Sequence, residues 1–317
     1  MMTKTDYLYP WKHPKRYNAF SEYQKSRYGN RVQKVTVDAG FTCPNRDGSL
    51  AKGGCIYCNN ESFNPGYNSS QKSISQQIKE GIGFLRQRYK NIYKFIVYFQ
   101  PYSNTYAPLE VLKKYYEEAL SHEEVIGLTI GTRPDCVDEE KLDYLAFLAK
   151  NYDITIEYGL ESISDDTLKR INRGHDVQAF IDAMKITKER NLKTCTHLIF
   201  GFPWEEISLW LETAEWISVQ EPDFLKVHQL HVVKDTVLAK MYKKSPFPLL
   251  GYDEYLEIII QFLERLSPHI VIQRLFGEAP PRTLIAPHWN IRNTRLVKLL
   301  DELLEKKNTW QGRLYVK

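Results

Sequence analysis

The sequence is poor in cysteine and lacks long apolar runs. Only five of its 317 residues are cysteine. The most apolar windows, such as residues 258–263, are short and interrupted by Gln or by charge, so no segment fits a membrane span. The first ten residues contain no apolar core of the signal-peptide kind. We therefore expect a cytoplasmic protein whose thiols stay reduced, in which clustered cysteines indicate metal binding or catalysis rather than disulfides.

The sequence also lacks internal repeats, low-complexity tracts and a strong charge of one sign. Its formal net charge of +4 permits an anionic partner without requiring one. The apolar and charged fractions, 43% and 26%, are those of a globular protein. The length suggests about two domains, although a single α/β barrel can occupy about 250 residues.

The segment from residue 9 to residue 34 combines cations with aromatic rings, and only Glu22 opposes the cations. Either the rings pack on the rest of the protein, or the segment is a nucleic-acid surface on which cations meet phosphates and rings stack on bases. The residues are Lys12, Lys15, Arg16, Lys25, Arg27, Arg31 and Lys34, with Tyr9, Trp11, Tyr17, Phe20, Tyr23 and Tyr28.

From residue 32 onward, short apolar runs alternate with helical patterns. This alternation predicts an α/β fold with parallel strands joined by right-handed crossovers. Six strands are expected near residues 35–37, 94–99, 125–130, 154–158, 194–200 and 224–231, with a first helix that Ser73 or Ser75 caps and a second that starts at Pro108. A helix at 252–266, a strand at 270–276 and a helix at 291–306 look like an appended unit.

Three of the five cysteines, Cys43, Cys55 and Cys58, lie in one glycine-rich loop after the first strand. A structural zinc site usually has four ligands in two pairs, whereas this loop has one Cys-x-x-Cys pair and one distant cysteine. Three thiolates suit a [4Fe–4S] cluster with one open iron that can chelate S-adenosylmethionine. The alternatives are a zinc site with three cysteines and one histidine, and unrelated free thiols. Cys195, inside a predicted strand, is expected to be a small buried residue, and Cys136 stays open as a further ligand.

With these motifs the chain resembles the radical SAM superfamily, and within it the YhcC/YtqA group, near the branch of the elongator catalytic subunit and oxygen-independent coproporphyrinogen oxidase. The common superfamily spacing puts three residues between the first two cysteines, whereas eleven stand here, and the elongator-like branch also has a widened gap. The resemblance covers about residues 35–287. It implies a partial (β/α)6 TIM-like barrel at 32–235, an N-terminal extension at 1–31 and a C-terminal α+β extension or substrate lid at 236–317.

The resemblance also implies residue roles around the two cofactors, the [4Fe–4S] cluster and S-adenosylmethionine. Arg173 would bind the methionine carboxylate, because a guanidinium forks onto two oxygens; a surface ion pair with Asp165 or Asp166 is the alternative. Gln100 and Asn104 would meet the methionine amine unless they only shape a turn. Glu161 would contact the cofactor, Tyr57 would cover the adenine, and His197 would face the cofactor unless it is a hydrogen-bonded core histidine.

Further polar residues are candidates for contact with substrate. Arg133 and Asp135 follow the third strand, where barrel folds place their sites, although a structural ion pair is equally compatible. Period two is expected to put Lys226, His228 and His231 on one face of the sixth strand. The appended unit contains three charged residues close together in the sequence, Arg274, Glu278 and Arg282. They form either a lid over an anionic group of the substrate or a salt-bridged loop.

The function that the resemblance implies is modification of the wobble uridine in the anticodon loop of tRNA. The MnmL-type relatives suggest conversion of 5-carboxymethylaminomethyl-(2-thio)uridine to 5-aminomethyl-(2-thio)uridine, with a reductant such as flavodoxin or ferredoxin. Single-stranded loops allow such a base to be splayed into a pocket. Two alternatives stay open: a radical dehydrogenase of a porphyrin-like or other small molecule, and a non-catalytic, metal-containing RNA-binding module.

Overall fold

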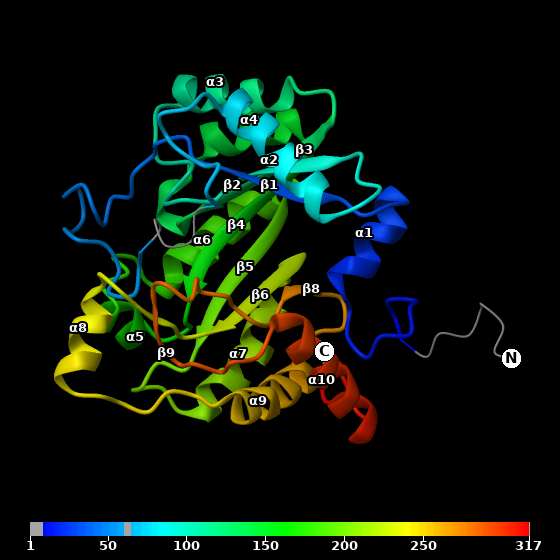
Figure 1. Ribbon diagram of the computed structural model, residues 1–317, viewed down its shortest axis with the longest axis vertical. Helices are drawn as coiled ribbons and strands as arrows, with labels where there is room; N and C mark the ends of the chain where they lie inside the picture. The colour runs from blue at the N-terminus through cyan, green and yellow to red at the C-terminus, as the bar shows by residue number, and fades with distance from the viewer. Residues whose placement is uncertain (1–8, 60–64, 317) are drawn as a thin grey trace, which may run out of the picture. The chain divides into compact units, whose positions relative to one another are not determined.

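The computed structural model describes residues 9–59 and 65–316 (Figure 1). The chain divides into two compact units. The first runs from Arg27 to His197, and the second joins the residues before Arg27 to those after His197. The boundary falls inside strand β5, Lys193–Phe200, so each unit contains part of this strand. The three-part division expected from the sequence stays a prediction.

The first unit is a parallel sheet covered by helices, as the alternating pattern predicts (Figure 1). The strands follow the order of the sequence, from β1 to β4 and the first part of β5. Helix α2 packs on β1, α3 on β3, and α4 and α6 on β4. The elements are β1 Gln33–Val37, α2 Ile74–Arg88, β2 Phe95–Phe99, α3 Leu109–Leu120, β3 Val125–Thr132, α4 Glu139–Leu148, β4 Asp153–Glu161, α5 Asp165–Arg170 and α6 Val177–Lys188.

The two faces of this sheet differ because side chains alternate along each strand. Val35 and Val97 are paired in register, and both are fully buried. On the other face, Lys34 of β1 forms a 2.7 Å ion pair with Glu157 of β4. Three strand spacings of about 4.8 Å would separate β1 from β4 by roughly 14 Å in a flat sheet, so this contact shows that the sheet curls around its polar face.

Side-chain caps start several helices of this unit. Ser73, one of the two predicted caps, accepts a hydrogen bond from the Gln76 amide and precedes α2. Pro108 precedes α3, as expected. Asp138 and Asp176 cap α4 and α6 in the same way as Ser73. Each cap satisfies an amide that the first turn leaves without an intrahelical partner.

The second unit continues with parallel strands and then departs from the predicted pattern. Its strand β8 pairs in parallel with β6, so the expected strand at 270–276 belongs to a sheet rather than to a separate appended element. Helix α8 and the antiparallel pair β7–β9 were not predicted. The elements are α7 Ile207–Gln220, β6 Phe224–Gln229, β7 Val232–Val233, α8 Val237–Lys244, α9 Tyr252–Arg265, β8 Val271–Arg274, β9 Leu284–Ala286 and α10 Asn293–Lys306.

The basic, aromatic segment near the N-terminus is ordered and engaged with its own chain. It contains helix α1, Phe20–Tyr28, which was not predicted. In the second unit, Lys15 and Arg16 form ion pairs with α10, and the Phe20 and Tyr23 rings pack edge-on against Phe224. These contacts match the packing interpretation of the segment. None of the helices in the described part of the chain has the length and apolarity that crossing a membrane requires.

Candidate active site

The cysteine loop is compact and largely buried. Cys43 and Cys55 are 8% and 6% exposed, and Cys58 is half-buried. The loop closes on itself, because the Cys58 amide donates to the Cys55 carbonyl and the Arg46 amide to the Cys43 carbonyl. Burial raises the pKa of the Cys43 thiol and raises that of Cys58 to about 12. Thiolates at these positions therefore need a positively charged partner such as a metal centre.

The spacing of the three sulfurs fits a cluster better than a single ion. Cys55 contributes to the raised pKa of Cys43, and Cys55 and Cys43 contribute to that of Cys58, so the thiols are neighbours. Within residues 9–59 and 65–316, however, they do not form a group whose ligand atoms all lie within 4.8 Å of one another. Zinc–sulfur bonds of about 2.3 Å would draw the sulfurs closer than that. Three separated thiols, two of them buried and one half-buried, suit a [4Fe–4S] cluster with an open iron.

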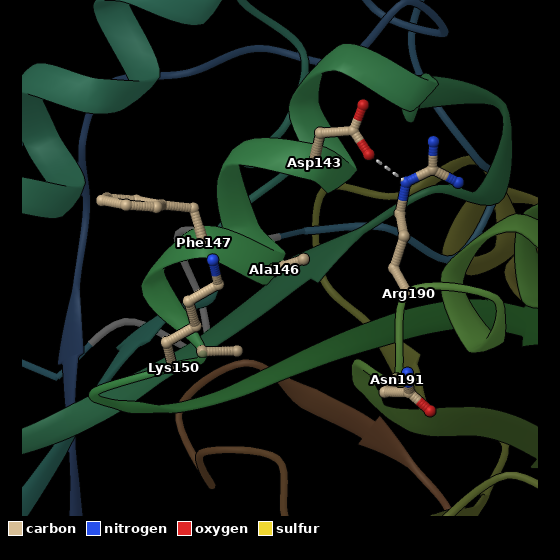
Figure 2. Close-up of a pocket in the computed structure, with 7 residues that line it drawn as sticks. Asp143, Ala146, Phe147, Lys150, Arg190 and Asn191 are labelled. Carbon is tan, nitrogen blue, oxygen red and sulfur yellow. Dashed lines mark hydrogen bonds and ion pairs between the residues drawn. The ribbon is translucent and has the colours of Figure 1, made fainter.

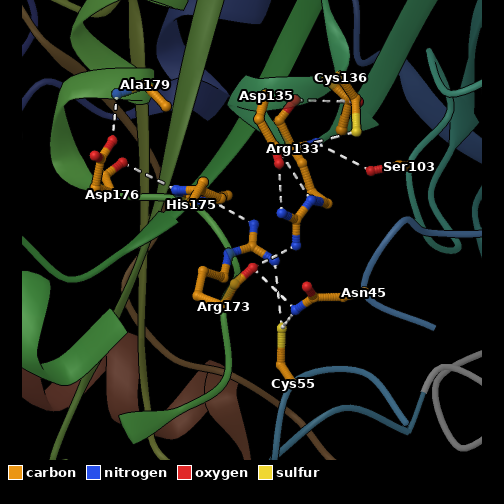
Figure 3. Close-up of polar contacts among 12 residues, drawn as sticks. Asn45, Cys55, Ser103, Arg133, Asp135, Cys136, Arg173, His175, Asp176 and Ala179 are labelled. Carbon is orange, nitrogen blue, oxygen red and sulfur yellow. Dashed lines mark hydrogen bonds and ion pairs between the residues drawn. The ribbon is translucent and has the colours of Figure 1, made fainter. Parts of the chain in front are cut away.

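Asn45 joins this loop to the segment after α5, and sequence reasoning missed it. Its side chain is fully buried, and its Nδ2 donates to the carbonyls of Asn172 and Arg173 and approaches the Cys55 sulfur at 3.7 Å. Figure 3 shows Asn45 and Arg173 converging on this sulfur. The Ile56 amide adds a 3.0 Å hydrogen bond to the Ile171 carbonyl. These contacts dock residues 171–173 against the cysteine loop.

Arg173 lies in the interior of this cluster. Its Nη1 is 3.6 Å from the Cys55 sulfur, and its Nη2 is 3.5 Å from a Glu161 oxygen and donates to the Gly159 carbonyl. Burial alone would lower the pKa of Arg173, but Tyr57, Cys55 and Glu161 outweigh it and raise the pKa well above its usual value. The guanidinium is therefore always charged. The alternative of a surface ion pair with Asp165 or Asp166 is wrong, because Arg173 is buried and its carboxylate partner is Glu161.

Glu161 is held in a strained backbone conformation at the end of β4. Its φ of +73° lies in the left-handed region, which costs a non-glycine residue about 1–2 kcal/mol. The side chain is nearly buried and faces Arg173. It also contributes, after burial, to the raised pKa of Tyr57. Tyr57, Glu161, Arg173 and Cys55 thus form one cluster at the carboxyl end of the sheet, where barrel folds place their sites.

Arg133 and Asp135 form a two-bonded ion pair beside this cluster. Arg133 Nε and Nη2 donate to the two Asp135 oxygens at 2.8 and 2.6 Å, and Nη1 donates to the Arg173 carbonyl. The Arg133 side chain is 2% exposed. Both residues are therefore engaged in positioning the Arg173 backbone (Figure 3), and their contact with substrate stays a prediction. The Cys136 sulfur lies 3.8 Å from Asp135 Oδ1.

Asn104, a candidate for contact with the methionine amine, is held after β2 by hydrogen bonds to backbone carbonyls. Asn104 Nδ2 donates to the carbonyls of Phe99, Pro101 and Gly131, which is the turn chemistry named as its alternative. Asn104 Oδ1 is buried and has no hydrogen-bond partner within the described residues, so it is the atom that a ligand would meet. Gln100 directly follows β2 and is half-buried. His197 Nε2 lies 3.0 Å from Glu157 Oε2.

In the second unit, the structure corrects one expectation about the sixth strand. Strand β6 ends at Gln229, so His231 lies outside it. The expectation that His231 shares a strand face with Lys226 and His228 was wrong, because it is an odd number of positions from both. The His228 and His231 rings still stack with centroids 6.3 Å apart, because the chain leaves the strand before His231. Burial, then the Arg274 charge, lowers the pKa of His231 to about 4.

The loop that follows β8 is anchored to this strand end. Gln229, which sequence reasoning missed, exchanges hydrogen bonds with Gly277, accepting from its amide at 3.0 Å and donating to its carbonyl at 3.3 Å. The three charged candidates of this unit, Arg274, Glu278 and Arg282, are exposed. Their role as a lid stays a prediction.

A separate hollow of about 430 Å³ lies on the outer helices of the first unit (Figure 2). Of its three charged lining residues, Arg190 is already paired with Asp143 at 2.6 Å, and it also pairs with Glu139. It contains no residue of the cysteine loop or of the strand ends, so it is not the site described above. The lining residues are Asp143, Ala146, Phe147, Ala149, Lys150, Arg190 and Asn191.

Two family models match successive parts of the chain between residues 43 and 306. The model described as the Radical SAM superfamily matches residues 43–217, from the first cysteine of the loop to α7. A model described as the Radical_SAM C-terminal domain matches residues 222–306.

Full-length relatives agree with these matches. The protein MJ0486 of Methanocaldococcus jannaschii is 39% identical over 92% of this chain and 89% of its own length. YtqA of Bacillus subtilis is 31% identical over 95% of this chain and 93% of its own length. The tRNA uridine(34) acetyltransferase of Methanocaldococcus infernus is 28% identical over 57% of this chain, and the matched region is 34% of that enzyme.

A solved structure of the archaeal Elp3 of Methanocaldococcus infernus has a similar fold. It superimposes with a TM-score of 0.68 at 20% sequence identity, over 88% of this chain and 64% of the Elp3 chain. The likeness confirms the predicted partial (β/α)6 barrel fold.

Proposed function

Because this chain belongs to the radical SAM superfamily, within the group that contains YhcC and YtqA, we propose that it modifies the wobble uridine of tRNA. Its cofactors are a [4Fe–4S] cluster and S-adenosylmethionine. The proposed reaction converts 5-carboxymethylaminomethyl-(2-thio)uridine to 5-aminomethyl-(2-thio)uridine. The observation that carries the cofactor assignment is the buried cluster of three cysteines, Glu161 and Arg173.

Different residues of the site would bind the cluster and S-adenosylmethionine. Cys43, Cys55 and Cys58 would hold the cluster. Arg173 and Glu161, already positioned beside Cys55, would hold the carboxylate and amine of the methionine part of S-adenosylmethionine, since a fixed guanidinium matches a carboxylate. When bound, the two cofactors supply a 5′-deoxyadenosyl radical. Asn45 and Arg133 keep Arg173 in place through its carbonyl.

The proposed reaction balances as an oxidation followed by hydrolysis. The radical chemistry that the bound cofactors would supply would remove a hydrogen atom from the CH2 between the amine and the carboxylate. Loss of one more electron, to a one-electron acceptor, and of a proton from the amine then gives an imine. Water hydrolyses the imine to 5-aminomethyl-uridine and glyoxylate. Glyoxylate is therefore a second product by which the reaction can be followed.

Two observations support tRNA as the substrate. The M. infernus relative is named for its action on tRNA uridine(34). Helix α8 also presents three exposed lysines, Lys240, Lys243 and Lys244, that have no ion pair within the described part of the chain. Most cations of the N-terminal segment are already paired, so α8 is the better surface for phosphates.

The substrate is tested by nucleoside mass spectrometry of bulk tRNA from a strain that lacks this protein. We expect 5-carboxymethylaminomethyl derivatives to accumulate and 5-aminomethyl derivatives to disappear. Wild-type protein should restore the 5-aminomethyl nucleoside, and the Cys55→Ala protein should not. Unchanged 5-aminomethyl derivatives with no accumulated precursor would overturn the proposal.

The α8 lysines give a second, binding-level prediction. Replacing Lys240, Lys243 and Lys244 with Gln should weaken tRNA binding by at least about tenfold at low salt. The slope of log affinity against log salt concentration should also become less steep by about two, since each lost phosphate contact reduces the slope by about 0.7. The matched control replaces Lys25, Lys113 and Lys141, each already in a local ion pair, and loses the same charge. If both triple variants weaken tRNA binding equally, α8 is not a specific tRNA-binding surface.

A further inference from the structure

A second group of metal-ligating side chains lies on the polar face of the first unit. Glu157 of β4 and Cys195 and His197 of β5 each offer one ligand atom, and these three atoms lie within 4.8 Å of one another. Cys195 and His197 are two residues apart on one strand, so both project from the same face. None of the three belongs to the cysteine loop.

The chemistry of the three donors is that of a zinc ligand set. A thiolate, an imidazole nitrogen and a carboxylate oxygen are the donors that proteins use for zinc, and three protein ligands leave a fourth position open. Cys195 is fully buried, and the Glu157 side chain is 0% exposed. We propose that Glu157, Cys195 and His197 bind one zinc ion, separate from the [4Fe–4S] cluster.

The surroundings of Glu157 are compatible with this site. Its two oxygens are already assigned to different partners: Oε1 is 2.7 Å from Lys34 Nζ, and Oε2 is 3.0 Å from His197 Nε2. Zinc would replace the hydrogen bond between Oε2 and Nε2 with a bond to each atom. Lys34 would then stay on Oε1 as the outer partner that orients a ligating carboxylate.

Zinc binding at this site releases the Cys195 thiol proton. His197 must be neutral with its Nε2 lone pair toward the metal, so any proton on Nε2 has to move to Nδ1 or leave. Two anionic ligands and the zinc ion sum to zero charge, and the nearby Lys34 adds one positive charge. The zinc proposal does not depend on the identity of the substrate. The zinc proposal can therefore be wrong while the tRNA proposal is right, and the tRNA proposal can be wrong while the zinc proposal is right.

The test uses the anaerobically reconstituted full chain with its cluster in place. Zinc chloride is added, unbound metal is removed by desalting, and zinc and iron are measured by mass spectrometry. We expect about one zinc ion per chain in addition to about four iron atoms, and zinc-edge X-ray absorption that shows one sulfur ligand with nitrogen or oxygen ligands. Cys195→Ser should reduce zinc to below about a tenth of an ion per chain and leave the iron content unchanged.

Matched variants make the outcome decisive. Cys136→Ser removes a different buried thiol and should keep the zinc. His197→Gln should lose it, which covers the case in which Cys195→Ser does not fold. A wild-type protein without zinc, zinc that survives Cys195→Ser or His197→Gln, or an absorption spectrum with three or four sulfur ligands overturns the proposal. The last result would place the zinc on the cysteine loop instead.

Discussion

Cys55→Ala protein, reconstituted without oxygen, should show no iron–sulfur absorbance and form no 5′-deoxyadenosine from S-adenosylmethionine. Cys55 is the cysteine most tightly built into the site, since Asn45 Nδ2 approaches its sulfur at 3.7 Å and Arg173 Nη1 at 3.6 Å. The cysteine loop contains no fourth cysteine that could replace it, because the remaining cysteines, Cys136 and Cys195, lie elsewhere in the sequence. Losing one of three thiolates therefore removes both cluster stability and the chemistry that depends on it.

The control for this experiment is Cys195→Ala. It also removes a buried thiol, but one on strand β5 outside the cysteine loop. We expect this variant to keep the iron content and the absorbance of the wild type. If Cys55→Ala retains a full cluster, or if both variants lose it equally, the assignment of the cluster to Cys43, Cys55 and Cys58 is wrong.

Arg173→Ala should weaken binding of S-adenosylmethionine by roughly 10–100-fold, because a charge-assisted hydrogen bond contributes about 1.5–3 kcal/mol. It should also destabilise the protein by about 3–5 kcal/mol, because the nearly buried Glu161 carboxylate loses its partner. Binding is measured by equilibrium dialysis of anaerobic holoprotein, and stability by urea unfolding.

Two further variants separate binding from folding. Arg173→Lys keeps the charge but loses the fork, so it should recover most of the stability and little of the affinity. The double variant Arg173→Ala with Glu161→Gln also removes the carboxylate charge that Arg173 balances, and it should unfold at higher urea than Arg173→Ala alone. Wild-type affinity in folded Arg173→Ala protein would exclude Arg173 from the cofactor site.

The close packing around Arg173 predicts that the neighbouring glycines tolerate little change. A Cβ on Gly159 would stand 2.5 Å from Arg173 Nη2 and 2.6 Å from Glu161 Oε1. Gly174 has a φ of +76°, and a Cβ there would collide with Asn45 Oδ1. Glycine is thus required twice, once for space beside the ion pair and once for the turn that brings Arg173 to the cysteine loop.

Several features were predictable because they depend on neighbours in the sequence. Alternating apolar runs predicted the parallel strands, Ser73 was a recognisable cap, and the cysteine spacing identified the loop. Helices α1 and α8 were missed. Both are short, so their stability depends on packing. Helix α1 also has almost no apolar periodicity, whereas α8 is amphipathic but contains only eight residues.

The sequence alone determined that three thiols share one loop and that polar residues follow the strands, because spacing and periodicity are properties of the covalent chain. It did not determine which of those residues meet. Asn45 was an unremarked loop residue until the fold placed it between Cys55 and the Arg173 carbonyl. The left-handed backbone of Glu161 and the convergence of Cys195 and His197 on Glu157 were likewise decided only by the tertiary structure. The physical reason is that such contacts join distant segments whose approach is fixed by the packing of the whole sheet and its helices.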